Sequence, residues 1–291
     1  MNVRATFPTQ AVDTRVLNGM SVDVEDWFQV GAFERVIDRG DWDGLGDRVV
    51  ANTDACLDLF AQASVHATFF TLGWVAERHP DLVRRIAAAG HEVASHGWDH
   101  ARVFTMTPAE FRADLARTRR VLEDAAGEPV RGYRAPSFSI DARTPWAHEA
   151  LAAAGYAYSS SVAPVVHDHY GWPASPRFAW QPCTDAPLVE VPVSVARVAG
   201  RHLATGGGFF RLLPAALTDL AVRQANRVGQ PAAFYFHPWE IDPAQPRVAD
   251  APLRSRLRHY SRLGAMRGKL AGLLGRHRWG RMDAVVAALP A

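Results

Sequence analysis

Residues 80–96 read PDLVRRIAAAGHEVASH, and this stretch contains one complete helix–strand unit. Pro80 suits the first turn of a helix, and Gly90 stands just past the expected helix end, where a left-handed backbone is common. Residues 91–96 form a short apolar run that predicts a buried strand ending at His96. The stretch therefore predicts a helix that packs on a strand of a parallel sheet.

The same alternation continues on both sides of this unit. Strands are expected over 18–26, 66–72, 91–96, 130–135, 156–162, 188–195 and 232–237, and helices over 47–63, 80–89, 107–127, 144–154 and 214–228. A long loop is expected over 27–46, a loop at 206–208, and a basic helical tail after the last strand. Strands that alternate with helices predict an α/β fold with a parallel sheet or barrel. A barrel of about 250 residues with an appendage fits the chain length.

Composition narrows the class of protein. The chain has 291 residues, of which 48% are hydrophobic and 21% are charged, as in ordinary soluble globular proteins. Its two cysteines, Cys56 and Cys183, support neither a disulfide framework nor a cysteine zinc site. The sequence shows no secretory signal in its first seventeen residues and no apolar run of about 20 residues. We therefore expect a cytoplasmic protein, with the inner membrane face as a further option.

Basic residues accumulate toward the C-terminus. Residues 251–282 contain nine Lys or Arg and no acid. A solvated helix face accounts for this run, and so does a surface for an anionic partner such as an acidic glycan or a membrane lipid. Nucleic acid is not expected as a partner, because no recognised binding motif accompanies the charge. The sequence does not indicate an oligomeric state.

Three acids end the first strand. Asp23, Glu25 and Asp26 follow an apolar, β-branched run. Strand alternation places Asp23 and Glu25 on one face, while Asp26 begins the loop. Two of the acids could serve as metal ligand and general base, although solvated loop acids are the simpler interpretation. The residues leave open whether Glu25 or Asp26 would bind the metal.

Two histidines follow another strand. His96 and His100 could place two neutral nitrogens on one divalent ion, and an acidic ligand would complete a site with open positions. Taken alone, the pair also fits surface or capping histidines. Right-handed crossovers bring the carboxyl ends of all parallel strands to one face. The histidines and the acids are therefore expected to lie together.

Two further strand ends carry candidate groups. Arg134 could orient and ionise a carboxylate through a bidentate pair, although a surface salt bridge is the alternative. His237 could protonate a leaving amine, although a buried structural histidine is the alternative. Together with the metal ligands, these groups supply a Lewis acid, a general base and a general acid. This set is what hydrolysis of an amide requires.

The ordered set of motifs resembles the NodB-like polysaccharide deacetylases (carbohydrate esterase family 4), and within them the branch associated with exopolysaccharide and exosortase loci. The resemblance covers residues 18–282. The motifs are SVDVEDWF (21–28), HATFF (66–70), SHGWDH (95–100), GYRAPSF (132–138), HDHYG (167–171), GGGFFRL (206–212) and FHPWE (236–240).

The resemblance implies a fold, a cofactor and a set of roles. The fold would be a distorted (β/α) barrel with seven or so strands. Asp23 would be the general base, His96 and His100 would be metal ligands, and Glu25 or Asp26 would be the acidic ligand. The metal would be divalent, with zinc as the first choice and cobalt, nickel or manganese as alternatives.

The resemblance further implies that Arg134 orients the base and that His237 is the general acid. Substrate contacts are assigned to Trp27, Pro136, Phe138 and Trp239. The implied reaction removes an N-acetyl group from an amino sugar of an exopolysaccharide or its precursor, by attack of water activated on the metal. A backbone N–H near Ser137 and the metal would hold the oxyanion.

Two departures from the family pattern stand out. The first motif reads Asp-Val-Glu-Asp where much of the family has two adjacent aspartates, and Ser159 stands where this branch would carry an aspartate. The same motifs also fit hydrolysis of a small amide, ureide or formamide, or a non-catalytic carbohydrate-binding protein. We expect an N-terminal extension over 1–17, a barrel over 18–250, and a basic helical extension over 251–291 packed on the barrel.

Overall fold

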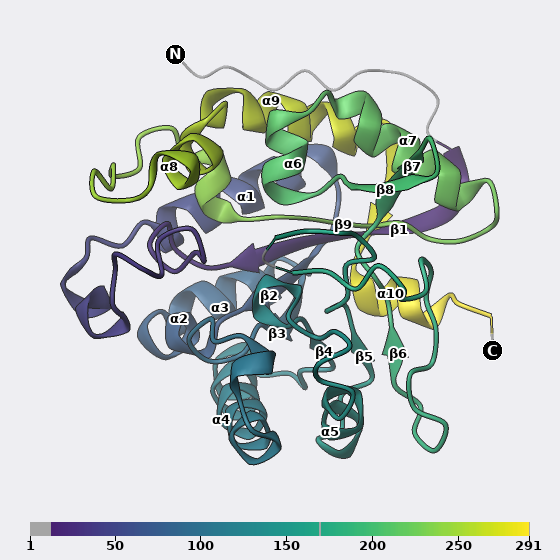
Figure 1. Ribbon diagram of the computed structural model, residues 1–291, viewed down its shortest axis with the longest axis horizontal. Coiled ribbons are helices and arrows are strands. Elements are labelled where there is room, and N and C mark those ends of the chain that lie inside the picture. Colours follow the sequence, from purple (N-terminus) through teal and green to yellow (C-terminus); the bar gives the residue numbers. More distant parts are fainter. Residues whose placement is uncertain (1–12, 169, 291) are drawn as a thin grey trace.

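A parallel sheet, curled into a distorted barrel, organises the computed structural model, which describes residues 13–168 and 170–290 (Figure 1). The predicted (β/α) barrel is confirmed. Across the sheet the strands follow the order β9 (Ala233–Phe236), β1 (Asp13–Val24), β2 (Thr68–Thr71), β3 (Glu92–Ser95), β4 (Gly132–Tyr133), β5 (Tyr158–Ser159) and β6 (Val189–Glu190).

The two edge strands of this sheet, β6 and β9, do not pair as strands. One residue connects them instead: the backbone N–H of Ser194 donates to the carbonyl of Ala233 at 2.9 Å, and the backbone N–H of Ala233 donates to Ser194 Oγ at 2.8 Å. The sheet thus curls almost to closure, and this is the distortion of the barrel.

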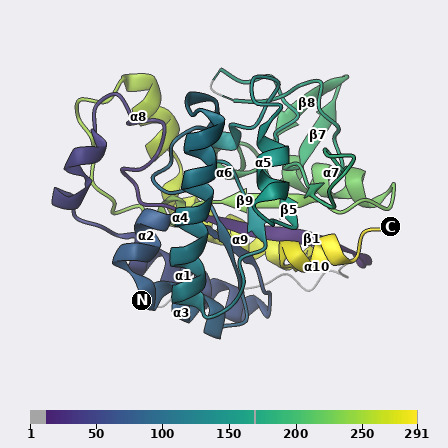
Figure 2. The same cartoon turned by 90° about the horizontal axis from the view of Figure 1, so that it is seen from below.

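Helices cover the outside of the curled sheet (Figures 1 and 2). They are α1 (Val49–Ala63), α2 (Gly73–Arg78), α3 (Pro80–Ala88), α4 (Pro108–Ala126), α5 (Ala147–Ala153), α6 (Gly207–Leu212), α7 (Ala215–Asn226) and α9 (Leu263–Leu274). In helix α4, local sequence signals determine where the helix begins and ends. Thr107 and Glu110 make a reciprocal capping box at its start, and Gly127 ends it with a φ of 73°.

Alternation along β1 separates the core from the barrel interior. Met20, Val22 and Val24 are fully buried in the apolar layer between the sheet and the helices. Burial of each such side chain contributes roughly 1.5–3 kcal/mol. The alternate residues Ser21 and Asp23 point into the barrel, where they meet Arg134. The two-residue period of the strand thus places polar groups inside and apolar groups outside.

The C-terminal region corrects the prediction of a wholly helical tail. It consists of α8 (Leu253–Tyr260), α9, β10 (His277–Gly280) and α10 (Met282–Ala287). Strand β10 pairs in parallel with the start of β1, with Trp279 opposite Asn18. His277 and Trp279 are buried and Arg278 is exposed, a two-residue pattern too short to stand out in an arginine-rich stretch. The strand extends the main sheet to eight strands.

Four other segments differ from expectation. Residues 206–208 begin helix α6 rather than forming only a loop, and α2 precedes α3 without a sequence signal for a separate helix. The 27–46 loop contains a 3₁₀ turn, η1 (Arg39–Gly44), and β7 (Val195–Val198) and β8 (Arg201–Ala204) form a separate hairpin. The other 3₁₀ turns are η2 (Val103–Thr105), η3 (Pro136–Phe138) and η4 (Pro238–Ile241).

The predicted N-terminal extension lies partly outside the described residues. Residues 1–12 are not described, and residues 13–17 belong to β1. Among the described helices, none has both the length and the apolar character that a bilayer-spanning segment needs.

Candidate active site

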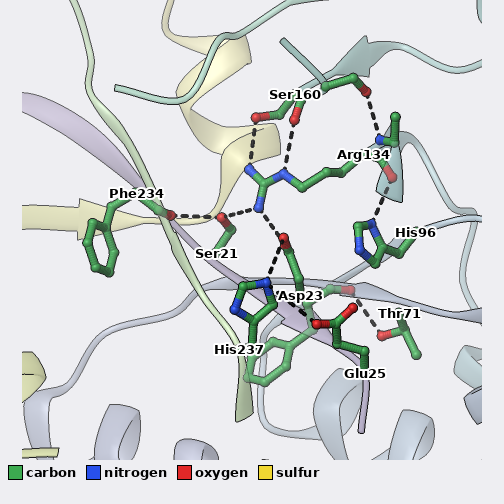
Figure 3. A network of polar contacts seen from close by, with 12 residues as sticks. Ser21, Asp23, Glu25, Thr71, His96, Arg134, Ser160, Phe234 and His237 are labelled. Carbon is green, nitrogen blue, oxygen red and sulfur yellow. Dashed lines mark hydrogen bonds and ion pairs between the residues drawn. The ribbon is translucent and has the colours of Figure 1, made fainter. Parts of the chain in front are cut away.

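The barrel gathers the candidate side chains at the carboxyl ends of four strands. The residue that follows each strand is Glu25 after β1, His96 after β3, Arg134 after β4 and His237 after β9. Figure 3 shows them directed toward one another around Asp23, which lies near the end of β1. The strand-end position predicted for these residues therefore brings them into one cluster.

Three side chains form a group that can hold a metal ion. One ligand atom each from Glu25, His96 and His100 lies within 4.8 Å of the others. His100 Nε2 is 2.8 Å from Glu25 Oε2, yet this buried oxygen has no well-aligned hydrogen bond among the described residues. Two imidazoles and a carboxylate with a free lone pair match the donor set of catalytic zinc sites. The residues present fit a divalent cation.

The tautomer of His96 is set by its neighbour. His96 Nδ1 lies 2.8 Å from the backbone carbonyl of Arg134, which can only accept, so Nδ1 carries the proton. The other ring nitrogen, Nε2, is then free to bind a metal. Burial lowers the pKa of His96 to about 4, which keeps the ring neutral.

Charge also favours the ionised form of Glu25. Burial alone would raise the pKa of Glu25, but the imidazoles of His100 and His237 outweigh burial and lower it well below its usual range. Trp239 Nε1 donates a hydrogen bond of 3.1 Å to Glu25 Oε1. The carboxylate is therefore held in place by one oxygen and offers the other to a cation.

Asp26 faces a different part of the molecule. One carboxylate oxygen accepts the backbone N–H of Trp27 at 2.7 Å, and the other accepts those of Arg48 at 2.7 Å and Val49 at 3.0 Å. These contacts hold the start of α1, and burial raises the pKa of Asp26 to about 6. The geometry groups Glu25, and not Asp26, with the two histidines. It gives no support to Asp26 as a metal ligand.

Arg134 is fully buried and orients Asp23. Its NH1 donates to Asp23 Oδ1 at 2.6 Å and to Ser21 Oγ at 2.7 Å. Its Nε and NH2 donate to the carbonyl and hydroxyl oxygens of Ser160 at 3.0 and 2.8 Å. Asp23 Oδ2 remains without such a clamp and lies 4.0 Å from His237 Nε2. One oxygen of Asp23 is thus fixed and the other faces the cluster.

His237 closes the cluster on the opposite side. Its Nε2 lies 3.7 Å from Glu25 Oε1, and its Nδ1 lies 3.0 Å from Glu240 Oε2. Burial would lower the pKa of His237, but Glu25, Glu240 and Asp23 outweigh burial and raise it to about 9. The charge of a bound cation would act in the opposite direction. The ring is held by Nδ1 and presents an N–H at Nε2 toward Asp23 and Glu25.

Sequence reasoning missed Glu240 and Arg211. Glu240 is fully buried, and Arg211 Nε lies 3.2 Å from Glu240 Oε1. Arg211 is anchored in turn by the backbone carbonyls of Arg258 and His259. A signal was available, because His237 and Glu240 are three residues apart around Pro238, as in a capping box. Arg211 has no comparable local signal.

Ser159 lies beneath this site rather than in it. Ser159 Oγ donates to Ser161 Oγ at 2.8 Å, and Ser161 Oγ accepts the backbone N–H of Ala135 at 2.9 Å. The serine pair therefore supports the strand end next to Arg134. The buried carboxylate that contacts the candidate general acid, His237, belongs to Glu240.

The four predicted substrate-contact residues lie in the interior of the protein. Pro136, Phe138, Trp27 and Trp239 are all buried. Trp27 Nε1 donates to the carbonyl of Gly46 at 3.1 Å, which locks it inside the 27–46 loop. Trp239 stacks on His237 at 5.2 Å between ring centroids. Of the four, Trp239 contacts the cluster directly, and contact of any of them with a substrate stays a prediction.

The backbone beside the site is strained. Ser137 and Phe138 have φ values of 53° and 50°, and His100 has a φ of 60°. Left-handed backbone at a residue other than glycine costs on the order of 1–3 kcal/mol and concentrates at functional sites. The turn at Ser137 and Phe138 comes three residues after Arg134, in the region where a backbone N–H is predicted to hold an oxyanion.

Two hollows adjoin these residues. One, of about 300 Å³, opens beside His100 between Asp99 and the 27–46 loop and includes Phe28 and Trp42 in its lining. The other, of about 340 Å³, is lined by Asp141, Arg143 and residues 167, 168 and 170–173. The site therefore has room on its rim for a ligand larger than the reacting group.

Two solved structures share the barrel fold of this chain. A crystal structure from Mycobacterium smegmatis, provisionally described as a polysaccharide deacetylase, superposes with a TM-score of 0.60 at 22% identity, covering 98% of this chain and 93% of that one. An allantoinase structure gives a TM-score of 0.58 at 16% identity, with 94% and 89% covered. At these identities the likeness shows the fold alone.

Two stretches of the sequence match known families. Residues 38–159 match the family described as polysaccharide deacetylase, and residues 160–287 match a domain of unknown function, DUF3473. Residues 38–159 of this chain, about two fifths of its length, are therefore similar to polysaccharide deacetylases.

Curated relatives match over part of their length. A chitooligosaccharide deacetylase from Bradyrhizobium is 31% identical over 144 residues, which are 49% of this chain and 59% of the relative. A peptidoglycan-N-acetylglucosamine deacetylase from Bacillus cereus is 35% identical over 98 residues, which are 33% of this chain and 36% of the relative. The chain thus spans between a third and three fifths of the length of these relatives.

Proposed function

We propose that this protein hydrolyses the N-acetyl group of an N-acetylated amino sugar in a glycan. The observation that carries the proposal is the meeting of the Asp23–Arg134 pair, the metal-binding group and His237 within one cluster. The match of residues 38–159 to the polysaccharide deacetylase family and the deacetylase names of the relatives support the reaction class.

Glu25, His96 and His100 would hold the metal. Zinc is our first choice, because two imidazoles and one carboxylate leave open positions as in catalytic zinc sites, and cobalt, nickel and manganese suit similar donors. When bound, the ion would supply positive charge that polarises the acetyl carbonyl and lowers the pKa of a water molecule.

Asp23 would act as the general base. Arg134 holds Oδ1 through its buried guanidinium, so that Oδ2 is left to face the cluster. From this position Oδ2 would take a proton from the water that attacks the acetyl carbon. The strained turn at Ser137 lies where a backbone N–H could stabilise the developing oxyanion.

His237 would act as the general acid. Glu240 holds Nδ1, and Nε2–H would give its proton to the sugar nitrogen as the C–N bond breaks. The products are acetate and a free amine. The Glu240–Arg211 pair would fix the orientation of the His237 ring, because both side chains are buried and paired with each other.

The proposal also extends to the substrate and to the location of the protein in the cell. We assign the substrate to an exopolysaccharide or its precursor and the protein to the inner face of the cytoplasmic membrane. The order of the seven motifs supports the first statement, and the basic C-terminal region supports the second.

Acetate release tests this function. The purified chain, supplied with zinc, should release acetate from N-acetylglucosamine oligomers, and Asp23→Asn should remove this activity while the bound zinc stays. A parallel panel of small amides and ureides identifies the substrate class. Full activity of Asp23→Asn would sink the mechanism, and turnover of the small amides alone would replace the substrate.

A further inference from the structure

Three of the four most exposed large apolar side chains in the described part of the chain lie at one place. Val166, Leu253 and Leu257 have exposed fractions of 87%, 69% and 59%. The leucines lie one turn apart on α8, and Val166 is two residues from Asp168, which pairs with Arg254 of α8 at 3.2 Å. Single exposed apolar side chains are ordinary, whereas a cluster of them indicates a contact surface.

The opposite side of α8 anchors it to the barrel. His259 is buried, stacks on Trp239 with ring centroids 4.2 Å apart, and lies 4.5 Å from the ring of Phe33. With 3.6 residues per helical turn, Leu257 lies about 160° and Leu253 about 120° around the helix from His259. The leucines therefore face away from the molecule.

Arginines flank the exposed leucines. Arg254, Arg256 and Arg262 are exposed, and residues 251–282 contain no acid. An acidic glycan would match the arginines but would gain nothing from two exposed leucines. An anionic bilayer accounts for both, because leucines enter the boundary of the acyl chains while arginines pair with lipid phosphates. We propose that α8 docks this protein on an anionic phospholipid surface.

The position of α8 connects this surface with the candidate active site. Figure 1 shows α8 beside the 27–46 loop, at the end of the barrel where β1 ends. Through His259, the helix contacts Trp239, which donates to Glu25. Docking would therefore bring the mouth of the site close to the lipid. A saccharide held at the membrane is the substrate class this favours, and that consequence rests on the proposed function.

Vesicle co-sedimentation of the full chain tests the docking. The chain should bind phosphatidylcholine vesicles that contain phosphatidylglycerol, bind pure phosphatidylcholine far more weakly, and lose affinity in high salt. The double variant R256Q/L257S should weaken binding on the order of tenfold, because it removes one arginine and one inserted side chain.

The end of helix α7 offers a matched control. Arg227 and Val228 are exposed just after α7, ahead of the start of β9, and Val228 is 60% exposed. The variant R227Q/V228S makes an equivalent chemical change away from α8, so it should bind vesicles like the wild type. Thermal unfolding by circular dichroism checks that both variants keep the fold.

Two results would overturn the docking. One is equal loss of binding in the control and the α8 variant. The other is failure to bind phosphatidylglycerol vesicles, or binding of a soluble anionic polysaccharide in their place, which would assign the surface to a glycan. Asp23→Asn should bind vesicles unchanged, so a failure of docking and a failure of the deacetylase proposal are seen separately.

Discussion

Arg134 serves the site through two different groups. Its guanidinium clamps Asp23, while its backbone carbonyl accepts the Nδ1 proton of His96. One residue thus orients the candidate base and fixes the tautomer of a candidate metal ligand. Since only the first contact depends on the side chain, substitution separates the two effects.

We expect Arg134→Lys to lower kcat/KM on the order of 100-fold, because a lysine cannot reproduce the fork that holds Asp23 and Ser160. Zinc affinity should change little, since the carbonyl that orients His96 remains. Activity assays and zinc titration measure the two quantities. Arg85→Lys, at an exposed pair with Asp54, is the control. A parallel loss of zinc would contradict the separation.

Glu240→Gln should reduce kcat on the order of tenfold or more and leave KM nearly unchanged. The amide can still accept from His237, but it removes the negative charge that favours the protonated ring and leaves Arg211 without its ion pair. Steady-state kinetics gives the split, and thermal unfolding reports any loss of stability. A rise in KM alone would assign Glu240 to substrate binding instead.

At the residue scale, the sequence predicted which side chains form the site better than it predicted the residues that they contact. Asp23, His96 and His237 were predicted from strand ends and are brought together in the structure. The choice of Glu25 over Asp26 depended on how the chain turns after β1, and the sequence does not encode that turn locally. Arg211 reaches the cluster from α6, a helix that the sequence does not predict.

At the element scale, helices were predicted well and the extent of strands was not. The structure confirms α4 together with its capping box, because that signal is local. Strands β4, β5 and β6 have only two residues each, although their apolar runs are longer. The curling of the sheet limits backbone pairing, and the remaining residues of each run pack in the core or enter the site.

The capping box gives a prediction at this scale. Thr107→Ala should lower the free energy of unfolding by about 1 kcal/mol, because the first turn of α4 loses the side-chain acceptor for the Glu110 N–H. Chemical denaturation measures this difference. Thr184→Ala, at an exposed loop position, should stay within about 0.5 kcal/mol of the wild type. Equal effects of the two substitutions would argue against the cap.

At the scale of the whole molecule, the C-terminal region closes the barrel end opposite the site. Glu92 is buried there and accepts hydrogen bonds from Tyr158 Oη at 2.8 Å and from the backbone N–H of Asp283 at 3.1 Å. Burial and the charge of Asp283 raise the pKa of Glu92 to about 7, and Arg281 is the nearby cation. This end of the barrel therefore contains a carboxyl group that favours its protonated form.

A pH dependence of stability follows. The folded state holds the Glu92 proton more tightly than the unfolded chain, whose ordinary pKa is 4.5. Stability from this group is therefore full below that value and declines as the pH rises through about 7, by about 1.4 kcal/mol for each pKa unit. Glu92→Gln should reduce the decline between pH 5 and pH 8, as measured by denaturation at both values. An unchanged pH slope would refute this.

The pairing of β10 with β1 has a consequence for how the chain reaches this fold during synthesis. Asn18 Nδ2 donates to the carbonyl of Arg278 at 3.2 Å, and Asn18 Oδ1 accepts the N–H of Ala232 at 2.8 Å. Both partners leave the ribosome more than two hundred residues after Asn18. Until then, one edge of β1 remains open to incorrect pairing, and such distant contacts form slowly. Nascent chains that stall before β10 are thus the ones we expect to need chaperones most.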